Sequence, residues 1–177
     1  MNNSLSPNAA FLIRSAHADD VPGIFNLIIS LAEYEGLRSE VSGNANALRS
    51  HLFAPNPVAE ALVAIKDNGV AGYALFYPNY STFLTQPGIY LEDLCVSPAY
   101  RRQGIGTALL RRVIHIAKER QVGRLEWNVL EWNAPAIALY QNLGAEILPD
   151  WRTCRMTAQT LREFKQGLRK RAGNADL

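Results

Sequence analysis

The stretch from residue 89 to residue 130 constrains the fold more than any other part of the chain. Residues 89–96 form an apolar run typical of a buried strand, and residues 124–130 form a second β-rich run. Between them, residues 104–120 predict a helix whose apolar stripe consists of Leu109, Leu110, Val113, Ile114 and Ala117. A strand, a helix and a strand in this order predict two parallel strands joined by a crossover helix.

The rest of the chain adds short strands and amphipathic helices before and after this unit. Periodicity predicts strands at residues 11–15, 58–65 and 70–78, a helix from Val21 to near Gly36, and a helix at residues 44–52. Further on, it predicts a helix at 133–143, strands at 145–148 and 151–156, and a last helix at 157–170. The Asp67-Asn68-Gly69 turn predicts a tight hairpin. We therefore expect an α/β fold, a mixed sheet with helices on its faces.

Composition indicates one globular domain in a reducing compartment. The 177 residues are 48% hydrophobic and carry a net charge of +2, enough for one core and too little charge to suggest a nucleic-acid partner. Cys95 and Cys154 lack CxxC spacing, and neither a signal peptide nor a membrane-length apolar run is present. We expect a cytoplasmic protein that binds no membrane, with one domain at residues 11–170 and disordered ends at 1–10 and 171–177. His17, His51 and His115 show no metal-ligand spacing, so no metal is expected.

The turn Arg101-Arg102-Gln103-Gly104-Ile105-Gly106 lies between the apolar strand and the crossover helix. A helix that starts there leaves main-chain N–H groups without partners, and its dipole and the arginines add positive charge. Glycines allow a close approach, so the turn predicts a pyrophosphate site. A Walker loop and a dinucleotide fingerprint both fail, the second because Leu109 stands where a third glycine is needed. The alternative is that the glycines only make a tight turn.

With these residues the sequence resembles the GNAT acetyltransferase superfamily, and within it the diamine (spermidine/spermine) and thialysine acetyltransferase branch. The resemblance extends from about residue 11 to about residue 161. Its motifs are Tyr90-Leu91-Glu92-Asp93-Leu94, Tyr100-Arg101, Gly104-Ile105-Gly106, Glu131-Trp132-Asn133, Ala136, Leu139-Tyr140 and Gly144-Ala145.

This resemblance implies a mostly antiparallel central sheet, helices on both faces and a parallel strand-helix-strand unit that binds acetyl-CoA. It also implies a homodimer. The pantetheine arm would contact the main chain of Leu94, Cys95 and Val96. The remaining cofactor residues would be Arg101, Arg102, Gln103, Gly104, Ile105, Gly106 and Thr107 at the pyrophosphate, with Asn133 and Tyr140.

Acetyl transfer to an amine requires a base and an acid. An alkyl ammonium has a pKa of about 10.4, so removing its proton at pH 7 costs about 4.6 kcal/mol. The resemblance implies Glu92 as the general base, directly or through water, and Tyr140 as the acid that protonates the leaving thiolate. Simple alternation puts Glu92 and Asp93 on opposite faces of the strand, so that at most one points at the reacting centre. Direct transfer needs no protein nucleophile, and Cys95 is interpreted as a packing residue.

The acceptor pocket is expected to combine acidic and aromatic residues, which suit a cationic amine. The resemblance maps it to Glu35 after the first helix, to Phe83 before the Leu91-Glu92-Asp93 strand, and to Trp151 near the end, beside Glu92 and Asp93. Ser81-Thr82-Phe83 replaces the Asp-Pro-Trp of polyamine enzymes. This difference favours a shorter diamine or a lysine-like amine as the acceptor.

Three functions remain open from the sequence. The first is acetylation of a small amine. The second is acetylation of a protein lysine or N-terminus, which predicts an open groove. The third is a non-catalytic module that binds acyl-CoA and makes no use of Tyr140.

Overall fold

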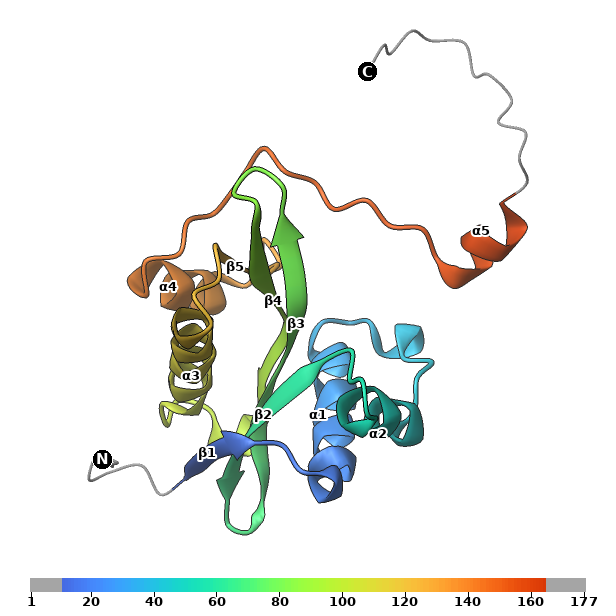
Figure 1. Ribbon diagram of the computed structural model, residues 1–177. Coiled ribbons are helices and arrows are strands. Elements are labelled where there is room, and N and C mark those ends of the chain that lie inside the picture. Colours follow the sequence, from blue (N-terminus) through green and yellow to red (C-terminus); the bar gives the residue numbers. More distant parts are fainter. Residues whose placement is uncertain (1–10, 165–177) are drawn as a thin grey trace, which may run out of the picture. The chain divides into compact units, whose positions relative to one another are not determined.

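The computed structural model describes residues 11–164 and contains a five-stranded sheet with the order β1-β2-β3-β4-β5 (Figure 1). The strands are β1 (Leu12–Ser15), β2 (Glu60–Lys66), β3 (Gly69–Ser81), β4 (Gln86–Val96) and β5 (Leu125–Glu126). Neighbours from β1 to β4 are antiparallel, whereas β4 and β5 are parallel. The mixed, mostly antiparallel sheet and its parallel pair confirm the expected fold class.

Helices follow from the predicted apolar stripes. The α-helices are α1 (Val21–Tyr34), α2 (Ala45–Phe53), α3 (Ile105–Glu119), α4 (Ala134–Asn142) and α5 (Ala158–Glu163). Short 3-10 helices are η1 (Ala18–Asp20), η2 (Arg38–Glu40) and η3 (Pro98–Tyr100). Asn44 caps α2 by accepting a 2.9 Å hydrogen bond from the Ala47 N–H. The first compact unit of the chain ends at Ile137 and the second begins at Ala138, inside α4.

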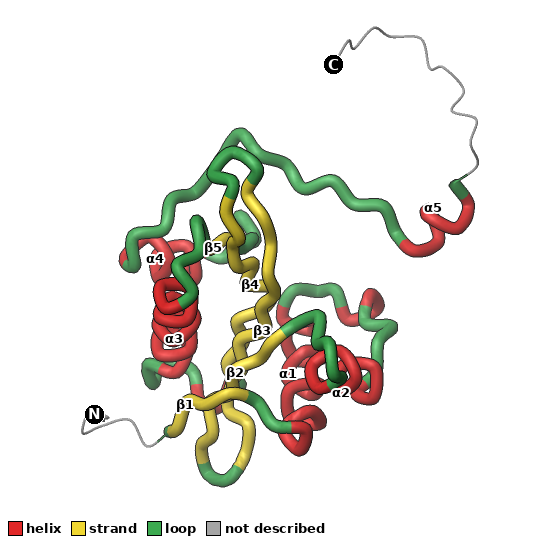
Figure 2. Tube along the Cα trace, in the orientation of Figure 1, coloured by secondary structure: helices red, strands yellow, loops and turns green. Residues whose placement is uncertain are grey.

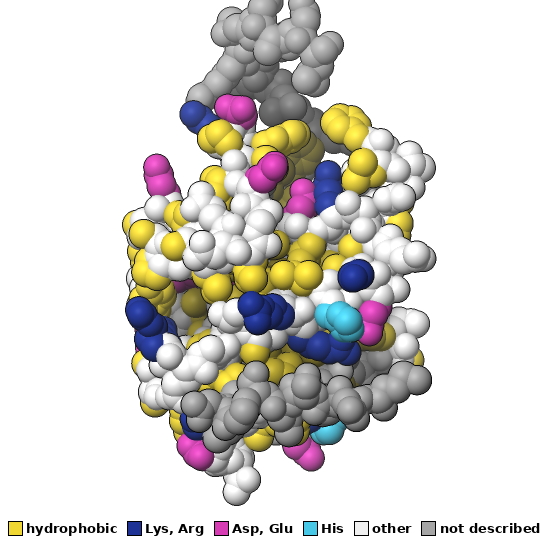
Figure 3. Space-filling view, turned by 90° about the vertical axis from the view of Figure 1, so that its left-hand side faces the viewer, with side chains coloured by type: hydrophobic (Ala, Val, Ile, Leu, Met, Phe, Trp, Pro, Cys, Tyr) yellow, Lys and Arg dark blue, Asp and Glu magenta, His cyan; other side chains and the backbone are white. Residues whose placement is uncertain are grey.

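In the first unit, α3 covers one face of the sheet, and α1 and α2 lie on the other (Figures 1 and 2). Gly72 of β3 allows the close approach of α3, since a Cβ there would come within about 3.3 Å of the Ile105 and Leu109 side chains. On the opposite face, Ile24 and Leu27 of α1 pack in one buried cluster with Tyr73 and Cys95. Figure 3 views the α3 side, where Lys and Arg side chains are spread among apolar ones.

The β2–β3 hairpin and the crossover each have a local cause. Asp67 and Asn68 have φ values of 50° and 61°, which the predicted Asp-Asn-Gly turn between β2 and β3 requires. Helix α3 leads from β4 to the parallel β5, as its place between two apolar runs predicts. The β5 strand is shorter than the predicted residues 124–130, because only Leu125 and Glu126 pair with β4.

A β-bulge interrupts β4 at Glu92. Leu75 of β3 is paired with Asp93, whereas the next residue, Phe76, is paired with Leu91, so that Glu92 is an extra residue in β4. Paired residues point to the same face, and each extra residue reverses the alternation beyond it. Leu91 therefore shares the α3 face with Phe76, while Asp93 faces α1 together with Leu75.

Two predicted strands in the second unit are wrong. Residues 145–148 and 151–156 form no strand, and Ile147, Leu148 and Trp151 are largely exposed. Their apolar runs have the composition of strands, but a strand also needs an edge to pair with, and within residues 11–164 they pair with none. The last helix ends at Glu163, and its predicted extension to residue 170, like the predicted disordered ends, lies outside the described residues.

Candidate active site

The glycine turn leads directly into α3. Gly104 is the N-cap, with a left-handed φ of 83°, and no side chain caps the first turn. The Ala108 N–H donates to the Gly104 carbonyl at 2.9 Å, which leaves the N–H groups of residues 105–107 ahead of the first helical bond. No acidic residue lies in this turn to repel an anion. The geometry is that of an anion-binding helix N-terminus.

Two side chains that were predicted to bind phosphate hold the turn itself. The Arg101 Nε donates to the Val96 carbonyl at 3.2 Å, and its guanidinium lies 4.8 Å from the centre of the Tyr34 ring. The Gln103 Oε1 accepts a 2.6 Å hydrogen bond from Lys66. Arg102 is exposed. The main-chain N–H groups and Arg102 are therefore the groups best suited to an anion.

The edge of β4 next to the turn is open. Pairing with β5 covers only Ile89 with Leu125 and Tyr90 with Glu126, whereas β4 continues to Val96. Glu126 is held there by Asn79 and by Arg124, both at 2.8 Å. Residues 91–96 thus have no strand partner on this side within the described part of the chain. A Cβ added to Gly106 would lie 3.6 Å from Val96, so the open edge leads to the N-terminus of α3.

Glu92 and Asp93 lie on the same face of the sheet, contrary to the expected alternation. The Tyr77 hydroxyl donates to Glu92 Oε2 at 3.2 Å, and the Tyr73 hydroxyl donates to Asp93 Oδ2 at 2.9 Å. These tyrosines are four residues apart on β3 and share the face that packs against α1. The bulge at Glu92 is the physical reason, because the extra residue reverses the alternation of side chains and puts Asp93 on the same face as Glu92.

Glu35 completes an acidic cluster with Glu92 and Asp93. Burial raises the pKa of Asp93, the charges of Glu92 and Glu35 raise it further, and the hydrogen bond from Tyr73 opposes both. Burial also raises the pKa of Glu35, which directly follows α1. Three carboxyl groups close enough for their charges to act on one another favour the binding of a cation.

Neighbouring groups remain neutral at physiological pH. Burial, followed by the Glu92 charge, raises the pKa of Tyr77 to about 12. Burial raises the pKa of Cys95 to about 11, and its thiol donates to the Leu27 carbonyl at 3.7 Å. A buried, protonated thiol is a poor nucleophile, which supports the packing role predicted for Cys95.

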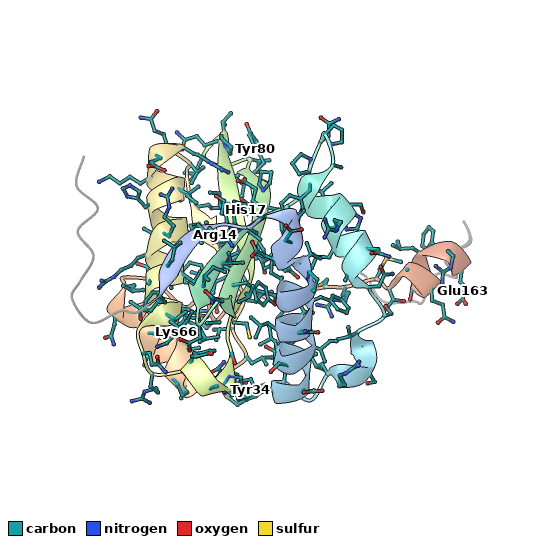
Figure 4. All side chains as sticks on the ribbon, turned by 90° about the horizontal axis from the view of Figure 1, so that it is seen from below. Arg14, His17, Tyr34, Lys66, Tyr80 and Glu163 are labelled. Atoms are coloured by element: carbon teal, nitrogen blue, oxygen red, sulfur yellow. The ribbon has the colours of Figure 1, made fainter. Side chains whose placement is uncertain are left out.

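Two aromatic rings pack together beside the glycine turn, and one of them, Tyr34, contacts Arg101. Tyr34, at the end of α1, lies 5.5 Å from Trp132 between ring centres, with the rings tilted by 56°. Figure 4 shows Tyr34 and Lys66 near one end of the sheet and His17 and Tyr80 near the other. The glycine turn, which contacts both Tyr34 and Lys66, and Glu35, which follows Tyr34, therefore lie at the same end of the first unit.

Helix α4 carries Asn133 at its start and Tyr140 two turns later. The Asn133 Oδ1 accepts a hydrogen bond from the Ala136 N–H at 3.3 Å, which caps the helix. Tyr140 is buried, and burial raises the pKa of its hydroxyl, so it is protonated at neutral pH and able to act as an acid.

Comparisons with known proteins agree with this geometry. The sequence profile of the Acetyltransferase (GNAT) family matches residues 29–145. The chain belongs to the GNAT acetyltransferase family. A thialysine N-epsilon-acetyltransferase of Sus scrofa is 37% identical over 167 residues, which cover 88% of this chain and 98% of the relative. An L-ornithine N5-acetyltransferase of Arabidopsis thaliana is 44% identical over 97 residues, 55% of this chain and 42% of the relative.

Solved structures show the same GNAT fold. An integron cassette protein from the mobile metagenome of V. cholerae has a TM-score of 0.71 at 21% identity, covering 87% of this chain and 96% of that one. As a GNAT family member, the protein is an N-acetyltransferase, and acetyltransferases with this fold use acetyl-CoA. The open edge of β4 and the uncapped start of α3 fit an extended thioester arm that leads to a pyrophosphate.

Other predicted features of this GNAT enzyme stand as follows. Within residues 11–164 no three His, Cys, Asp or Glu side chains gather as metal ligands. None of the helices in this range has the length and apolar character needed to cross a bilayer. A surface hollow lies between β1, β2 and the C-terminal half of α3, and its lining contains none of the predicted site residues.

Within the first unit, Phe83 lies far along the sheet from the acids that the structure brings together. Phe83 is 94% exposed in the β3–β4 turn. About six residues separate it from Asp93 along the paired strands, or roughly 20 Å. Trp151 lies in the second unit and is 77% exposed. Their predicted acceptor contacts stay predictions.

Sequence reasoning overlooked Tyr73, Tyr77 and Lys66. The two tyrosines are spaced by four in an otherwise apolar strand, a pattern that puts both hydroxyls on one face. This spacing was the available signal. Lys66 gave none, because its contact with Gln103 joins residues 37 positions apart.

Proposed function

We propose that the protein acetylates a primary amine of a small cationic acceptor, a diamine or a lysine-like molecule, with acetyl-CoA as donor. The observation that carries this proposal is the cluster of Glu35, Glu92 and Asp93 beside the open edge of β4. Three acids surrounded by tyrosine rings suit an ammonium group. The relatives' names also support an amino acid with a side-chain amine.

The donor is held mainly by main-chain groups in this proposal. The β4 edge at Leu94, Cys95 and Val96 would bind the pantetheine arm, and residues 101–107 would bind the pyrophosphate through N–H groups and Arg102. Asn133 and Tyr140 would complete the site. Acetyl-CoA supplies the acetyl thioester. An N–H of Cys95 or Val96 would stabilise negative charge on the acetyl oxygen.

Protons move through two side chains. Glu92 is exposed, so water reaches it, and it would take the proton that the acceptor's ammonium group loses. Asp93 and Glu35, which are half-buried, would hold that group in place. Tyr140 would give a proton to the departing thiolate. Because this thiolate has a pKa near 8.5, transfer from the phenol is uphill by about 1.5 units or more.

A substrate panel tests the function. Release of CoA thiol is measured with diamines, polyamines, thialysine, ornithine and lysine-containing peptides. Turnover of the small amines supports the proposal, and turnover of peptides alone would assign the protein to protein acetylation. Bound acetyl-CoA without turnover across the panel would assign a non-catalytic acyl-CoA-binding module.

Replacing Tyr140 by Phe tests the acid. Tyr140→Phe is expected to lower kcat by about 100-fold or more, the usual contribution of general acid catalysis, while acetyl-CoA binding is kept. Single-turnover thiol release and calorimetry measure the two quantities. Unchanged kcat would disprove the assigned role.

The homodimer and the cytoplasmic location predicted from the sequence belong to this proposal as well. Sedimentation of the purified protein tests the first, and fractionation of cells tests the second.

A further inference from the structure

We propose that the β2–β3 turn positions the glycine turn for acetyl-CoA, and that Lys66 is the positioning residue. This inference rests on the proposed function, because it assigns the glycine turn to the donor. Lys66 does not itself contact the donor. It holds the segment whose N–H groups do.

Three contacts join the two turns. Lys66 Nζ donates to Gln103 Oε1 at 2.6 Å and lies 5.7 Å from the centre of the Tyr100 ring. The Tyr100 hydroxyl donates to Asp67 Oδ2 at 3.2 Å. Adjacent residues of one hairpin thus hold the glycine turn at two points.

These two points flank the strained residue of the turn. Arg102 has a φ of 62°, in the left-handed region that residues with a Cβ disfavour. Such a conformation persists where the surrounding structure enforces it. Tyr100 and Gln103 lie on either side of Arg102 in the sequence, and both are tied to the β2–β3 turn. On the N-terminal side, Arg101 is tied to Val96 and Tyr34.

The β2–β3 turn is fixed by its backbone conformation and by the paired strands on either side. Asp67 and Asn68 both take left-handed conformations, and the turn closes strands β2 and β3, which pair from Lys66–Gly69 to Glu60–Phe76. Helix α3 begins two residues after Gln103, so the path of the turn sets the direction of the first N–H groups of α3. Loss of the support is therefore expected to weaken donor binding and to leave the acid cluster unchanged.

Calorimetry with acetyl-CoA tests the inference on the full chain. Lys66→Met and Tyr100→Phe are each expected to weaken binding about threefold to tenfold, as for the loss of one exposed, charge-assisted hydrogen bond. The double variant is expected to lose less than the product of the two effects, because both contacts support one turn. Lys66→Arg keeps a donor and restores most of the affinity.

Control variants distinguish a positioning role of Lys66 from a general effect of its charge and from a loss of folding. Lys118→Met removes an exposed lysine from α3 and is expected to leave the affinity unchanged. The KM for the amine at saturating acetyl-CoA stays at the wild-type value in all variants. Circular dichroism reports the fold, and Tyr100→Phe is conservative enough to fold if Lys66→Met does not.

The outcomes are distinct. Wild-type affinity in Tyr100→Phe, with a weakened Lys66→Met whose binding depends less on salt, would make Lys66 a direct phosphate ligand and overturn the inference. Wild-type affinity in both variants would also overturn it. A wild-type protein that binds no acetyl-CoA would instead refute the proposed function.

Discussion

The proposed donor side and the proposed acceptor side of the site meet on β4 but are built differently. The donor side consists of main-chain groups, namely the β4 edge and the N–H groups after Gly104. The acceptor side consists of side chains, with Asp93 and Glu92 held by Tyr73 and Tyr77. In the proposed function, β4 would therefore offer its edge to the donor and its bulged face to the acceptor. The donor side depends on backbone conformation, whereas the acceptor side depends on the carboxylate and hydroxyl oxygens of single side chains.

Gly104→Val is the strongest way to break the donor side alone. A Cβ at Gly104 meets nothing within 4 Å, so the cost comes from the φ of 83° and not from a clash. Strain of about 1–3 kcal/mol is expected to weaken acetyl-CoA binding by about 5- to 150-fold, as calorimetry would measure. Gly104→Asn is the matched control, since Asn tolerates this conformation, and it should retain most of the affinity. Equal losses in both variants would contradict the conformational cause.

Asp93→Asn breaks the acceptor side. Removing one charge from the acid cluster is expected to raise the KM for the amine about tenfold, with acetyl-CoA affinity unchanged. Because the pKa of Asp93 is raised, its charge is lost as pH falls through that raised value, and amine recognition is lost with it. Asp93→Asn has no carboxyl group at this position, so its KM for the amine lacks this dependence on pH. Steady-state kinetics from pH 5 to 9 measure both effects.

Asp19→Asn, at an exposed position in η1, is the control for Asp93→Asn and should leave both constants unchanged. A larger change in acetyl-CoA affinity than in amine KM after Asp93→Asn would contradict the separation of the two sides.

Tyr73→Phe removes one oxygen atom and tests the acceptor side alone. The hydrogen bond from Tyr73 lowers the pKa of Asp93, so its removal raises that pKa further. The acid limb of kcat/KM for the amine is expected to move to higher pH, so that the loss relative to wild type grows as pH falls and is small at alkaline pH. A limb that stays in place, or moves to lower pH, would contradict the role of Tyr73.

Gly106→Ala is expected to have the smallest effect. The added Cβ would lie 3.6 Å from Val96, an ordinary contact, and Gly106 has no positive φ. Acetyl-CoA affinity is expected to change by less than about threefold, the size of a tolerated surface change. A loss as large as that of Gly104→Val would show that the ligand approaches the backbone at position 106 so closely that even a Cβ atom blocks it.

Local patterns predicted most of the fold. The crossover unit, the Asp67-Asn68 hairpin and α1 to α4 depend on periodicities and turn residues within short windows. The strands predicted at residues 145–156 failed because an apolar run does not reveal whether an edge is available to it.

The resemblance named three acids that the structure brings close together, but it did not reveal their arrangement. Glu35, Glu92 and Asp93 were identified, and the alternation rule then put Glu92 and Asp93 on opposite faces. The bulge that overturns this depends on the register between β3 and β4, which no short window contains. The hydrogen bonds from Tyr73 and Tyr77 depend on the same register.

The open edge of β4 also affects how the protein behaves in concentrated solution. Main-chain groups of residues 91–95 on this edge, which no strand covers within the described part of the chain, are a template on which an extended segment of another molecule can add as a strand. A ligand that lies along this edge occupies the same groups and so competes with self-association. We therefore expect the enzyme with bound acetyl-CoA to stay unaggregated at protein concentrations at which the ligand-free enzyme aggregates.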